Sequence, residues 1–284
     1  MSKYKFSLIM ATYGRKEEVD SFLKSIKNID YDLSKIQIII VDQNDSINLS
    51  PIINSYKDEL IIEYVKSHKK GLSINRNIGL KLAEGQIVAF PDDDCEYLPS
   101  TLEEVEKNFR DTNVHVVMGR IVERDGSDSL RIWPKEELKI NKINFYTKCS
   151  SITIFVKSIN NSILFNEKLG AGTFFGSCED SDVLYSQLKN NRNIMYFPDI
   201  KIYHPHYDSN NNMDISKVQS YGLGFGGFVK SNLDIFLIYL FLKSIAYHFV
   251  KTIIGILTFR KEKIIKSGKA FLSRFKGLVM YKNE

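Results

Sequence analysis

The chain has 284 residues, of which 43% are hydrophobic and 26% are charged, so a disordered or low-complexity protein is excluded. The three cysteines, Cys95, Cys149 and Cys178, form no CxxC pair, which excludes a disulfide framework and a cysteine-based zinc site. A reducing, cytosolic compartment is the simplest expectation. The apolar run Phe6–Ala11 is too short for a signal peptide.

The net charge of +5 hides an uneven distribution. From Lys230 to the end, 11 Lys and Arg residues face 3 Asp and Glu residues, which gives +8. The first 229 residues hold 28 basic and 31 acidic residues, which gives −3. A basic, apolar tail behind a mildly acidic body indicates an anionic partner for the tail, either a membrane surface or a nucleic acid.

The first 122 residues alternate between apolar segments and helical patterns. Buried strands are predicted over Phe6–Ala11, Ile36–Val41, Leu60–Val65, Gln86–Phe90 and Val114–Val122. Helices are predicted over Glu17–Ile26, Leu72–Ala83 and, from a capping box of Ser100 with Glu103, up to about Phe109. Strands that are apolar throughout and alternate with helices predict a mostly parallel sheet, which binds ligands at the carboxyl ends of its strands.

The second half of the chain is less regular. A strand is expected over Ser151–Val156, and a helix over about Glu179–Lys189 with Ser177 as its cap. Short strands are expected over Ile194–Phe197 and Lys201–Tyr203, and a loop over residues 208–212. A glycine-rich stretch and the apolar tail follow.

Three polar clusters begin where predicted strands end: Thr12–Arg15, Asp42–Asp45 and Asp92–Asp94. Three adjacent carboxylates repel one another unless a cation or hydrogen bonds intervene. Oxygen ligands of this kind suit Mg²⁺ or Mn²⁺, which would neutralise charge on a phosphate leaving group. The alternative is a solvated acidic turn.

Other candidate groups are less specific. The acidic cluster at Glu179–Asp182 suits a general base, but acids also favour a helix N-terminus. Two histidines, His204 and His206, could offer one imidazole to a metal, or be structural. Arg76 precedes the acidic strand end and could pair with a diphosphate, with the acidic cluster, or in an ordinary surface ion pair.

The order of these clusters is more specific than any one of them. The segments SLIMATYGR, IIIVDQNDS, GLSINRNIGLKLAEGQIVAFPDDD, LGAGTFFGSCED and YHPH resemble the family 2 glycosyltransferases over roughly residues 5–207. The resemblance implies an α/β chain with the GT-A fold, a Rossmann-like and mostly parallel sheet flanked by helices. The expected domain covers residues 1–212, with a nucleotide-sugar half at about 1–122 and an acceptor half at about 123–212. A basic, amphipathic helical tail covers 213–284.

The resemblance also implies roles on the donor side. Thr12 and Arg15 would grip the nucleotide, Asp42 would read the base, usually uracil, and Arg76 would bind the nucleotide. Asp92 and Asp93 belong to the element that holds the metal diphosphate.

The remaining implied roles concern the metal and the acceptor. Asp94 is the expected direct ligand of Mn²⁺ or Mg²⁺, and His204 is the metal-side histidine, although His206 could be meant. Asp180 matches the catalytic base, with Glu179 beside it at the substrate. One departure is Pro91 before Asp92, where leucine is commoner in the family.

The implied reaction is inverting sugar transfer from a nucleoside diphosphate sugar, with UDP expected, to an acceptor hydroxyl in cell-surface polysaccharide or glycolipid assembly. A nucleotidyltransferase is the first alternative, but it needs a basic loop near the first strand, where Arg15 and Lys16 stand alone. A non-catalytic nucleotide-sugar or glycan-binding protein is the second, and the two intact acidic clusters argue against it.

The tail segment Leu233–Phe259 is long enough to span a membrane. Lys243, Tyr247 and Lys251 share one helical face, which favours a helix lying in the interface. Residues 233–276 are therefore expected on the membrane surface, with the protein peripheral on the cytoplasmic face. A span, a core helix or a contact between copies of the chain stays open. A nucleic-acid partner is not expected, because the basic residues lack interleaved stacking aromatics.

Overall fold

The computed structural model describes residues 2–158, 163–205 and 214–283. His206 and the loop expected at 208–212 lie outside these residues. The chain divides into two compact units, one of Met1–Leu164 with Leu184–Tyr207 and the other of Phe165–Val183 with Asp208–Glu284. The segment of residues 165–183, which the sequence places in the N-terminal domain, is thus grouped with the C-terminal helices.

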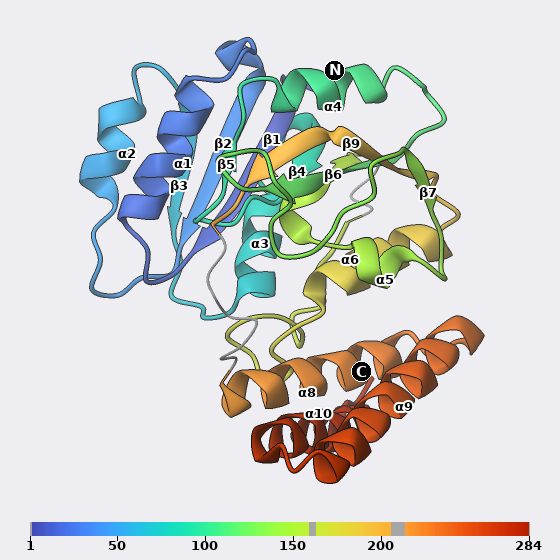
Figure 1. Cartoon of the computed structure of the whole chain (residues 1–284). Helices are drawn as coiled ribbons and strands as arrows, with labels where there is room; N and C mark the ends of the chain where they lie inside the picture. Colours follow the sequence, from blue (N-terminus) through green and yellow to red (C-terminus); the bar gives the residue numbers. More distant parts are fainter. Residues whose placement is uncertain (1, 159–162, 206–213, 284) are drawn as a thin grey trace. The chain divides into compact units, whose positions relative to one another are not determined.

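A nine-stranded sheet forms the centre of the first unit in the described residues, in the order β3-β2-β1-β4-β8-β6-β9-β5 with β7 on β9 (Figure 1). The strands are β1 (Tyr4–Thr12), β2 (Ile36–Asp42), β3 (Ile61–Lys66), β4 (Gly85–Ala89), β5 (Glu96–Tyr97), β6 (Val116–Val122), β7 (Leu138–Ile140), β8 (Ile154–Lys157) and β9 (Ile194–Tyr203). The sheet is parallel from β3 to β4 and between β6 and β9. Strand β8 pairs antiparallel with β4 and β6, and β5 and β7 each pair antiparallel with β9.

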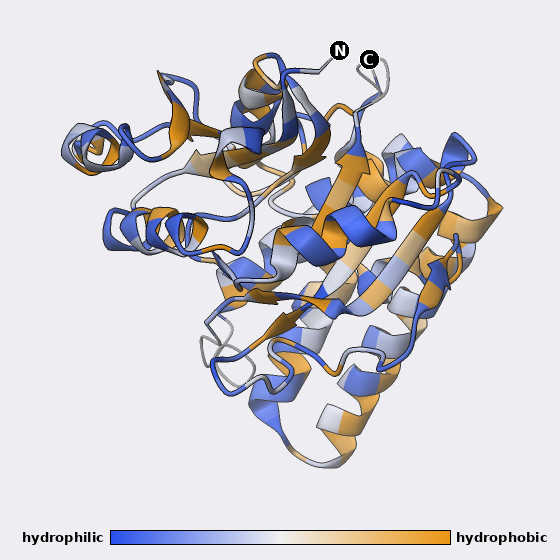
Figure 2. Ribbon diagram, turned by 90° about the horizontal axis from the view of Figure 1, so that it is seen from above, coloured by the Kyte–Doolittle hydropathy of each residue, from blue (hydrophilic) through white to orange (hydrophobic). Residues whose placement is uncertain are grey.

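The apolar content of the strands explains this sheet. Every residue of β2 is buried, and the strands are mostly orange in the hydropathy colouring of Figure 2. Such strands need cover on both faces, which helices and loops between them supply. The predicted α/β sheet flanked by helices is therefore confirmed, and in the described residues it is a mixed sheet in which parallel and antiparallel strand pairs are equally frequent.

The helices of the first unit are α1 (Glu17–Lys27), α2 (Ser50–Tyr56), α3 (Leu72–Leu80), α4 (Thr101–Asn108) and α5 (Phe145–Lys148), and α6 (Glu179–Lys189) runs across the boundary between the units. Helices α1, α3, α4 and α6 lie close to predicted positions, whereas the short helices α2 and α5 were not predicted. In α1, Val19, Phe22, Leu23 and Ile26 are buried at the helical period. Acidic residues in its first turn and lysines in its last suit the helix dipole.

Three local predictions need correction. Ser100 precedes α4, but its side chain makes no capping bond, because its backbone is already helical. The strand expected over Ser151–Val156 begins with a 3₁₀ turn at Ser151–Thr153. The two short strands expected after residue 193 are one strand, β9, in which the pairing with β6 shifts register around Met118 and Arg120.

The second unit contains the helices α8 (Ile215–Ser231), α9 (Ile235–Leu257) and α10 (Lys261–Met280), drawn in orange to red in Figure 1. Glycines set the close approach of α8 and α10. A Cβ atom at Gly226 would lie 2.2 Å from the carbonyl oxygen of Arg274, and one at Gly277 would lie 2.2 Å from that of Leu223. The glycine-rich stretch before the apolar tail is thus a helix that needs a bare backbone where it crosses its neighbour.

Candidate active site

The parallel register brings the first two polar clusters together at one edge of the sheet. Thr12, the last residue of β1, pairs with Asp42, the last residue of β2, and Asp42 pairs with Lys66 at the end of β3. Oγ1 of Thr12 donates a hydrogen bond of 2.8 Å to Oδ2 of Asp93. Thr12 therefore links the cluster after β2 to Asp92–Asp94 after β4, which together are called the acidic triplet.

Asp42 is fully buried, and both of its carboxylate oxygens are occupied. Oδ2 accepts from the Tyr64 hydroxyl at 2.6 Å and from Nζ of Lys66 at 2.8 Å. Oδ1 accepts from the backbone N–H and the side-chain amide of Asn44, each at 2.8 Å. Burial raises the pKa of Asp42, but the bonds from Lys66, Tyr64 and Asn44 outweigh it, so the pKa lies below its ordinary value.

Tyr64 and Lys66 are functional candidates that the sequence reasoning missed, whereas Asn44 belongs to the predicted cluster Asp42–Asp45. Tyr64 and Lys66 alternate on β3, so both point to one face of the sheet, and this period-two spacing was the available signal. Asn44 also accepts from the backbone N–H of Gly14 at 2.6 Å, which ties the loops after β1 and β2 to each other. Gly14 has φ of +75°, where glycine is favoured.

Each carboxylate of the acidic triplet has its own partners. NH2 of Arg76 binds Oδ1 of Asp92 at 2.6 Å, and Thr12 binds Asp93. Asp94 is held from two sides, by NH2 of Arg15 at 3.0 Å and by Nε2 of His204 at 3.2 Å. A freely solvated acidic turn is therefore excluded, because each of the three side chains is at least partly buried and engaged.

The electrostatics separate Asp93 from Asp94. Burial raises the pKa of Asp93 to about 7, with the charges of Asp92 and Asp94 adding to the effect and the Thr12 bond opposing it. Burial also raises the pKa of Asp94, but the hydrogen bond and charge of His204 overcome it and hold the pKa low. For His204, burial lowers the pKa and Asp94 more than compensates, so the pair favours imidazolium and carboxylate.

Arg76 is not in a surface ion pair. It lies on α3, its side chain is 0% exposed, and its guanidinium stands over the ring of Phe90 at 6.0 Å. NH2 of Arg76 also donates to Oγ of Ser151 at 3.2 Å. A buried guanidinium of this kind fixes Asp92 in place at the end of β4.

Asp92, Asp94 and His204 form the candidate metal site. One ligand atom from each lies within 4.8 Å of the others. Two carboxylates and an imidazole fit a divalent cation, and the imidazole favours Mn²⁺ over Mg²⁺, which prefers an all-oxygen shell. A cavity of 220 Å³ opens beside Asp94, and it is lined by Glu17, Glu18, Ser21, Cys95, Glu96, Arg124, Tyr203 and Pro205 as well.

Glu179 and Asp180 open α6 and belong to the second unit. Oδ1 of Asp180 accepts from the backbone N–H of Ser181 at 2.6 Å and from its hydroxyl at 3.2 Å. The hydroxyl of Ser177, predicted as the cap of this helix, instead donates to the carbonyl oxygen of Tyr221 at 3.1 Å. Glu179, Asp180 and Asp182 all lie in the first turn of α6, where acidic residues are favoured by the helix dipole.

The sequence profile of glycosyl transferase family 2 matches residues 7–173, more than half of the chain. The chain belongs to glycosyl transferase family 2. The match begins in β1, continues past the acidic triplet after β4 and ends before α6. The resemblance inferred from the spaced motifs is therefore confirmed.

Two curated relatives illustrate the family membership. The chain is 30% identical over 173 residues to the GalNAc(5)-diNAcBac-PP-undecaprenol beta-1,3-glucosyltransferase of Campylobacter jejuni, a match covering 58% of this chain and 55% of that protein. It is 25% identical over 222 residues to the poly(ribitol-phosphate) beta-N-acetylglucosaminyltransferase TarP of Staphylococcus aureus, covering 75% and 67%. The matches thus span about half and two thirds of these relatives.

Solved structures confirm the predicted GT-A fold. Residues 1–349 of TarS from S. aureus superpose with a TM-score of 0.63 at 17% identity, covering 96% of this chain and 92% of that one. The mannosyltransferase PcManGT from Pyrobaculum calidifontis, solved with GDP-Man and Mn²⁺, gives a TM-score of 0.64 at 14% identity, covering 98% and 88%. At these identities the likeness establishes the fold alone.

Proposed function

We propose that the chain is an inverting glycosyltransferase that moves a sugar from a UDP-sugar to a hydroxyl group of a glycan or lipid-linked acceptor. The observation that carries this proposal is the meeting of Thr12, Arg15, the acidic triplet and His204 at the carboxyl ends of the strands. The relatives named above transfer glucose to an undecaprenyl diphosphate-linked saccharide and N-acetylglucosamine to poly(ribitol phosphate), as their names state. Assembly of a cell-surface polysaccharide or glycolipid is the corresponding setting.

The residues of the first unit would bind the donor. Asp92, Asp94 and His204 are the groups that would hold a divalent cation, whose chemistry is to neutralise negative charge on the departing nucleoside diphosphate. Arg15, which now binds Asp94, has a side chain 31% exposed and can turn to a diphosphate oxygen. Thr12 keeps Asp93 in place beside these groups.

Asp42 is proposed to read the uracil base. Since its carboxylate already accepts four hydrogen bonds, contact with a base N–H requires the exchange of one of them. Lys66 is the partner that can leave, because its side chain is 40% exposed. Release of Lys66 would leave Oδ2 of Asp42 with the Tyr64 bond and one open acceptor site.

Asp180 is proposed as the general base. Its carboxylate would take the proton from the acceptor hydroxyl while that oxygen attacks the anomeric carbon. The new bond forms on one face of the sugar as the bond to the diphosphate oxygen breaks on the other, so the anomeric configuration inverts. Glu179 is proposed to contact the substrate beside it.

Membrane attachment through the C-terminal helices completes the proposal. A lipid-linked acceptor stays in the bilayer, so an enzyme bound to the cytoplasmic face encounters it by diffusion in the plane of the membrane. By length and composition α9 could cross a membrane, with a mean hydropathy of 1.5 and 11% of the tested stretch buried. We favour a peripheral location.

The test is UDP-sugar turnover with Mn²⁺ for wild type, for Asp180→Asn and for the control Asp199→Asn, which changes an exposed acid on β9. Asp180→Asn should lower kcat by about 10²–10⁴-fold while UDP affinity is retained. Equal turnover of all three would remove Asp180 from the base role. Release of pyrophosphate would favour a nucleotidyltransferase, and tight donor binding without turnover over any acceptor would favour a non-catalytic binding protein.

A further inference from the structure

The turn between α9 and α10 contains a backbone conformation that its residue does not favour. The N–H of Arg260 bonds to the carbonyl oxygen of Gly255 at 2.9 Å, and that of Phe259 to Ile256 at 3.1 Å. These two bonds form a Schellman motif, which places Phe259 at the C′ position with φ of +54°. Glycine is the usual residue there, because a Cβ atom makes the left-handed conformation costly.

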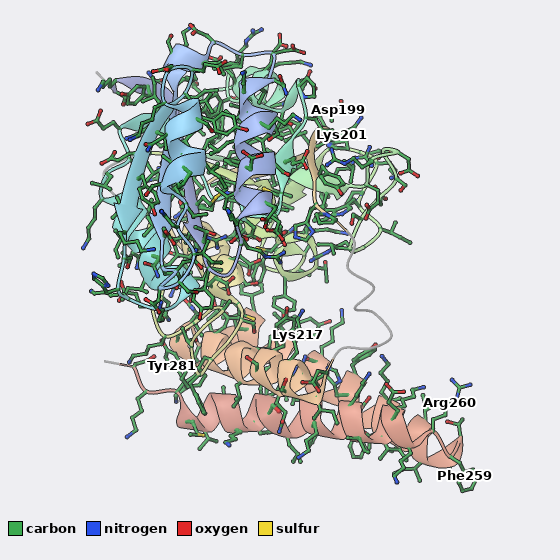
Figure 3. All side chains as sticks on the ribbon, turned by 90° about the vertical axis from the view of Figure 1, so that its left-hand side faces the viewer. Asp199, Lys201, Lys217, Phe259, Arg260 and Tyr281 are labelled. Atoms are coloured by element: carbon green, nitrogen blue, oxygen red, sulfur yellow. The ribbon has the colours of Figure 1, made fainter. Side chains whose placement is uncertain are left out.

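Phe259 gains no packing in return for this conformation. Its side chain is 94% exposed, and Figure 3 shows Phe259 and Arg260 together at the end of the helices opposite to Tyr281. A strained backbone that carries an exposed aromatic ring lowers stability without a compensating contact. Such a residue points to a function at the turn.

Basic side chains gather around the turn between α9 and α10. Lys251, Arg260, Lys261, Lys263 and Lys266 line an open pocket of 530 Å³ together with Glu262 and Ser267. Lys266 forms an ion pair of 2.5 Å with Glu262, whereas the other four cations have no ion-pair partner among the described residues. The pocket lies at the N-terminus of the 20-residue helix α10, whose dipole adds positive potential. It is therefore suited to a phosphate group.

The outer face of α9 is apolar, which reverses the arrangement of an ordinary surface helix. Exposed side chains on it include Ile235, Tyr239, Leu242, Phe249, Val250, Ile253, Ile256 and Leu257. A polar residue is turned inward instead, since Nε of Arg274 on α10 donates to Oγ of Ser244 at 2.8 Å. On the helical face predicted for Lys243, Tyr247 and Lys251, the side chains of Lys243 and Tyr247 are exposed beside apolar side chains. The neighbouring Ser244 is only partly exposed and contacts α10.

We propose that the α9–α10 turn is an insertion tip for an anionic bilayer, in which Phe259 enters the headgroup region and the cationic pocket binds lipid phosphate. This inference rests on the membrane attachment proposed above and adds the residues and the lipid chemistry. An anionic phospholipid matches both the apolar face of α9 and the cationic pocket, because its acyl chains can cover the former and its phosphate can bind in the latter. Free phosphate would satisfy only the pocket.

The decisive variant is Phe259→Gly, measured by co-sedimentation with vesicles of equal parts phosphatidylglycerol and phosphatidylcholine. We expect vesicle affinity to fall about tenfold, because the inserted ring is lost. The Tm should stay equal or rise by about 3 °C, because glycine suits the C′ position. The matched control is Ile132→Ala, which trims a side chain 87% exposed in the first unit and should leave vesicle affinity unchanged.

Charge is tested with the pair Lys261→Gln and Lys263→Gln against the control pair Lys276→Gln and Lys282→Gln at the other end of α10. Each cation removed from the pocket should lower affinity for the mixed vesicles about fivefold. Pure phosphatidylcholine vesicles should bind wild type weakly. Inorganic phosphate, added at the lipid phosphate concentration, should not displace wild type from the mixed vesicles.

Several results would overturn the insertion tip. The first is a Phe259→Gly variant that binds the mixed vesicles as tightly as wild type does. The second is wild type binding equally to mixed and to pure phosphatidylcholine vesicles, and the third is its displacement by inorganic phosphate. The fourth is a dimer that depends on Phe259 and does not bind vesicles. Sugar transfer to a soluble acceptor, followed in the same samples, should not change in any variant. If wild type transfers no sugar, the proposed function is contradicted. If wild type transfers sugar but does not bind vesicles, only membrane attachment and the insertion tip are contradicted.

Discussion

Oδ1 of Asp94 lies 3.2 Å from Nε2 of His204 because strand pairing fixes the two residues beside each other. Glu96 pairs with Tyr203 in the antiparallel ladder of β5 and β9, so the residues that flank this pair meet at the end of the ladder. Arg124 reinforces the ladder, since its guanidinium binds Glu96 and covers the ring of Tyr203 at 3.8 Å. The histidine is therefore delivered to the acidic triplet by the sheet.

This relationship makes His204 testable as a metal-side residue. His204→Asn removes an imidazole from the group of three and should raise the Mn²⁺ concentration needed for half-maximal transfer at least about tenfold. Mn²⁺ should also raise the Tm of wild type more than that of the variant, since a ligand stabilises the folded state that binds it. Both quantities come from a Mn²⁺ titration.

The matched control is His115→Asn, which changes a histidine that accepts a bond from the backbone of Asn193. Its Mn²⁺ dependence should match wild type. If His204→Asn and His115→Asn respond to Mn²⁺ alike, His204 does not hold the cation.

Arg76 should be a structural requirement of the site. Its guanidinium is fully buried against Phe90 and binds Asp92, so Arg76→Leu leaves Asp92 without that ion pair. We expect the free energy of unfolding to fall by about 2–4 kcal/mol, somewhat less than for a wholly buried pair because the side chain of Asp92 is 35% exposed. Urea denaturation measures the change, with the exposed Arg110→Leu as control. A loss no larger than in the control would contradict the prediction.

Asp42 should make stability depend on pH at the acid end. Its folded pKa lies below the ordinary 3.8, so its contribution is present above pH 3.8 and is lost as the pH falls through the folded pKa. Asp42→Asn should therefore cost about 2–3 kcal/mol at pH 7, where Lys66 loses its partner. The difference between wild type and variant should shrink below pH 3.8 in urea titrations, and a constant difference would refute the assignment.

Two glycines of α10 should respond oppositely to the same substitution. A methyl group at Gly277 would lie 2.2 Å from the carbonyl oxygen of Leu223, so Gly277→Ala must push α8 and α10 apart and should cost about 2–3 kcal/mol. Gly268 has no atom within 4 Å of that position, so Gly268→Ala should add about 1 kcal/mol through helix propensity. Thermal unfolding of the two variants checks the pair. A gain in Gly277→Ala would mean that the helices do not cross there.

The hydropathy pattern of short segments predicted most strands and helices of the first unit, because each of these elements carries its pattern within its own sequence. The strands of the sheet are apolar over their whole length, and α1 carries its buried residues at the helical period. Spaced motifs of the same region identified Thr12, Arg15, Arg76 and the acidic triplet as one group, which the structure brings together. Strand register, by contrast, is not local. The contact of Tyr64 and Lys66 with Asp42 could not be predicted because it depends on the pairing of β3 with β2.

The sequence by itself determined the family, the alternating pattern of strands and helices, and the acidic and basic side chains with which the protein works. The tertiary structure decided which of these groups touch, because contacts between distant residues depend on strand order and register that no single segment encodes. It paired Asp94 with His204, buried Arg76, and turned the apolar side of α9 outward. Helical periodicity can define the faces of a helix, but the neighbouring helices determine which face is covered.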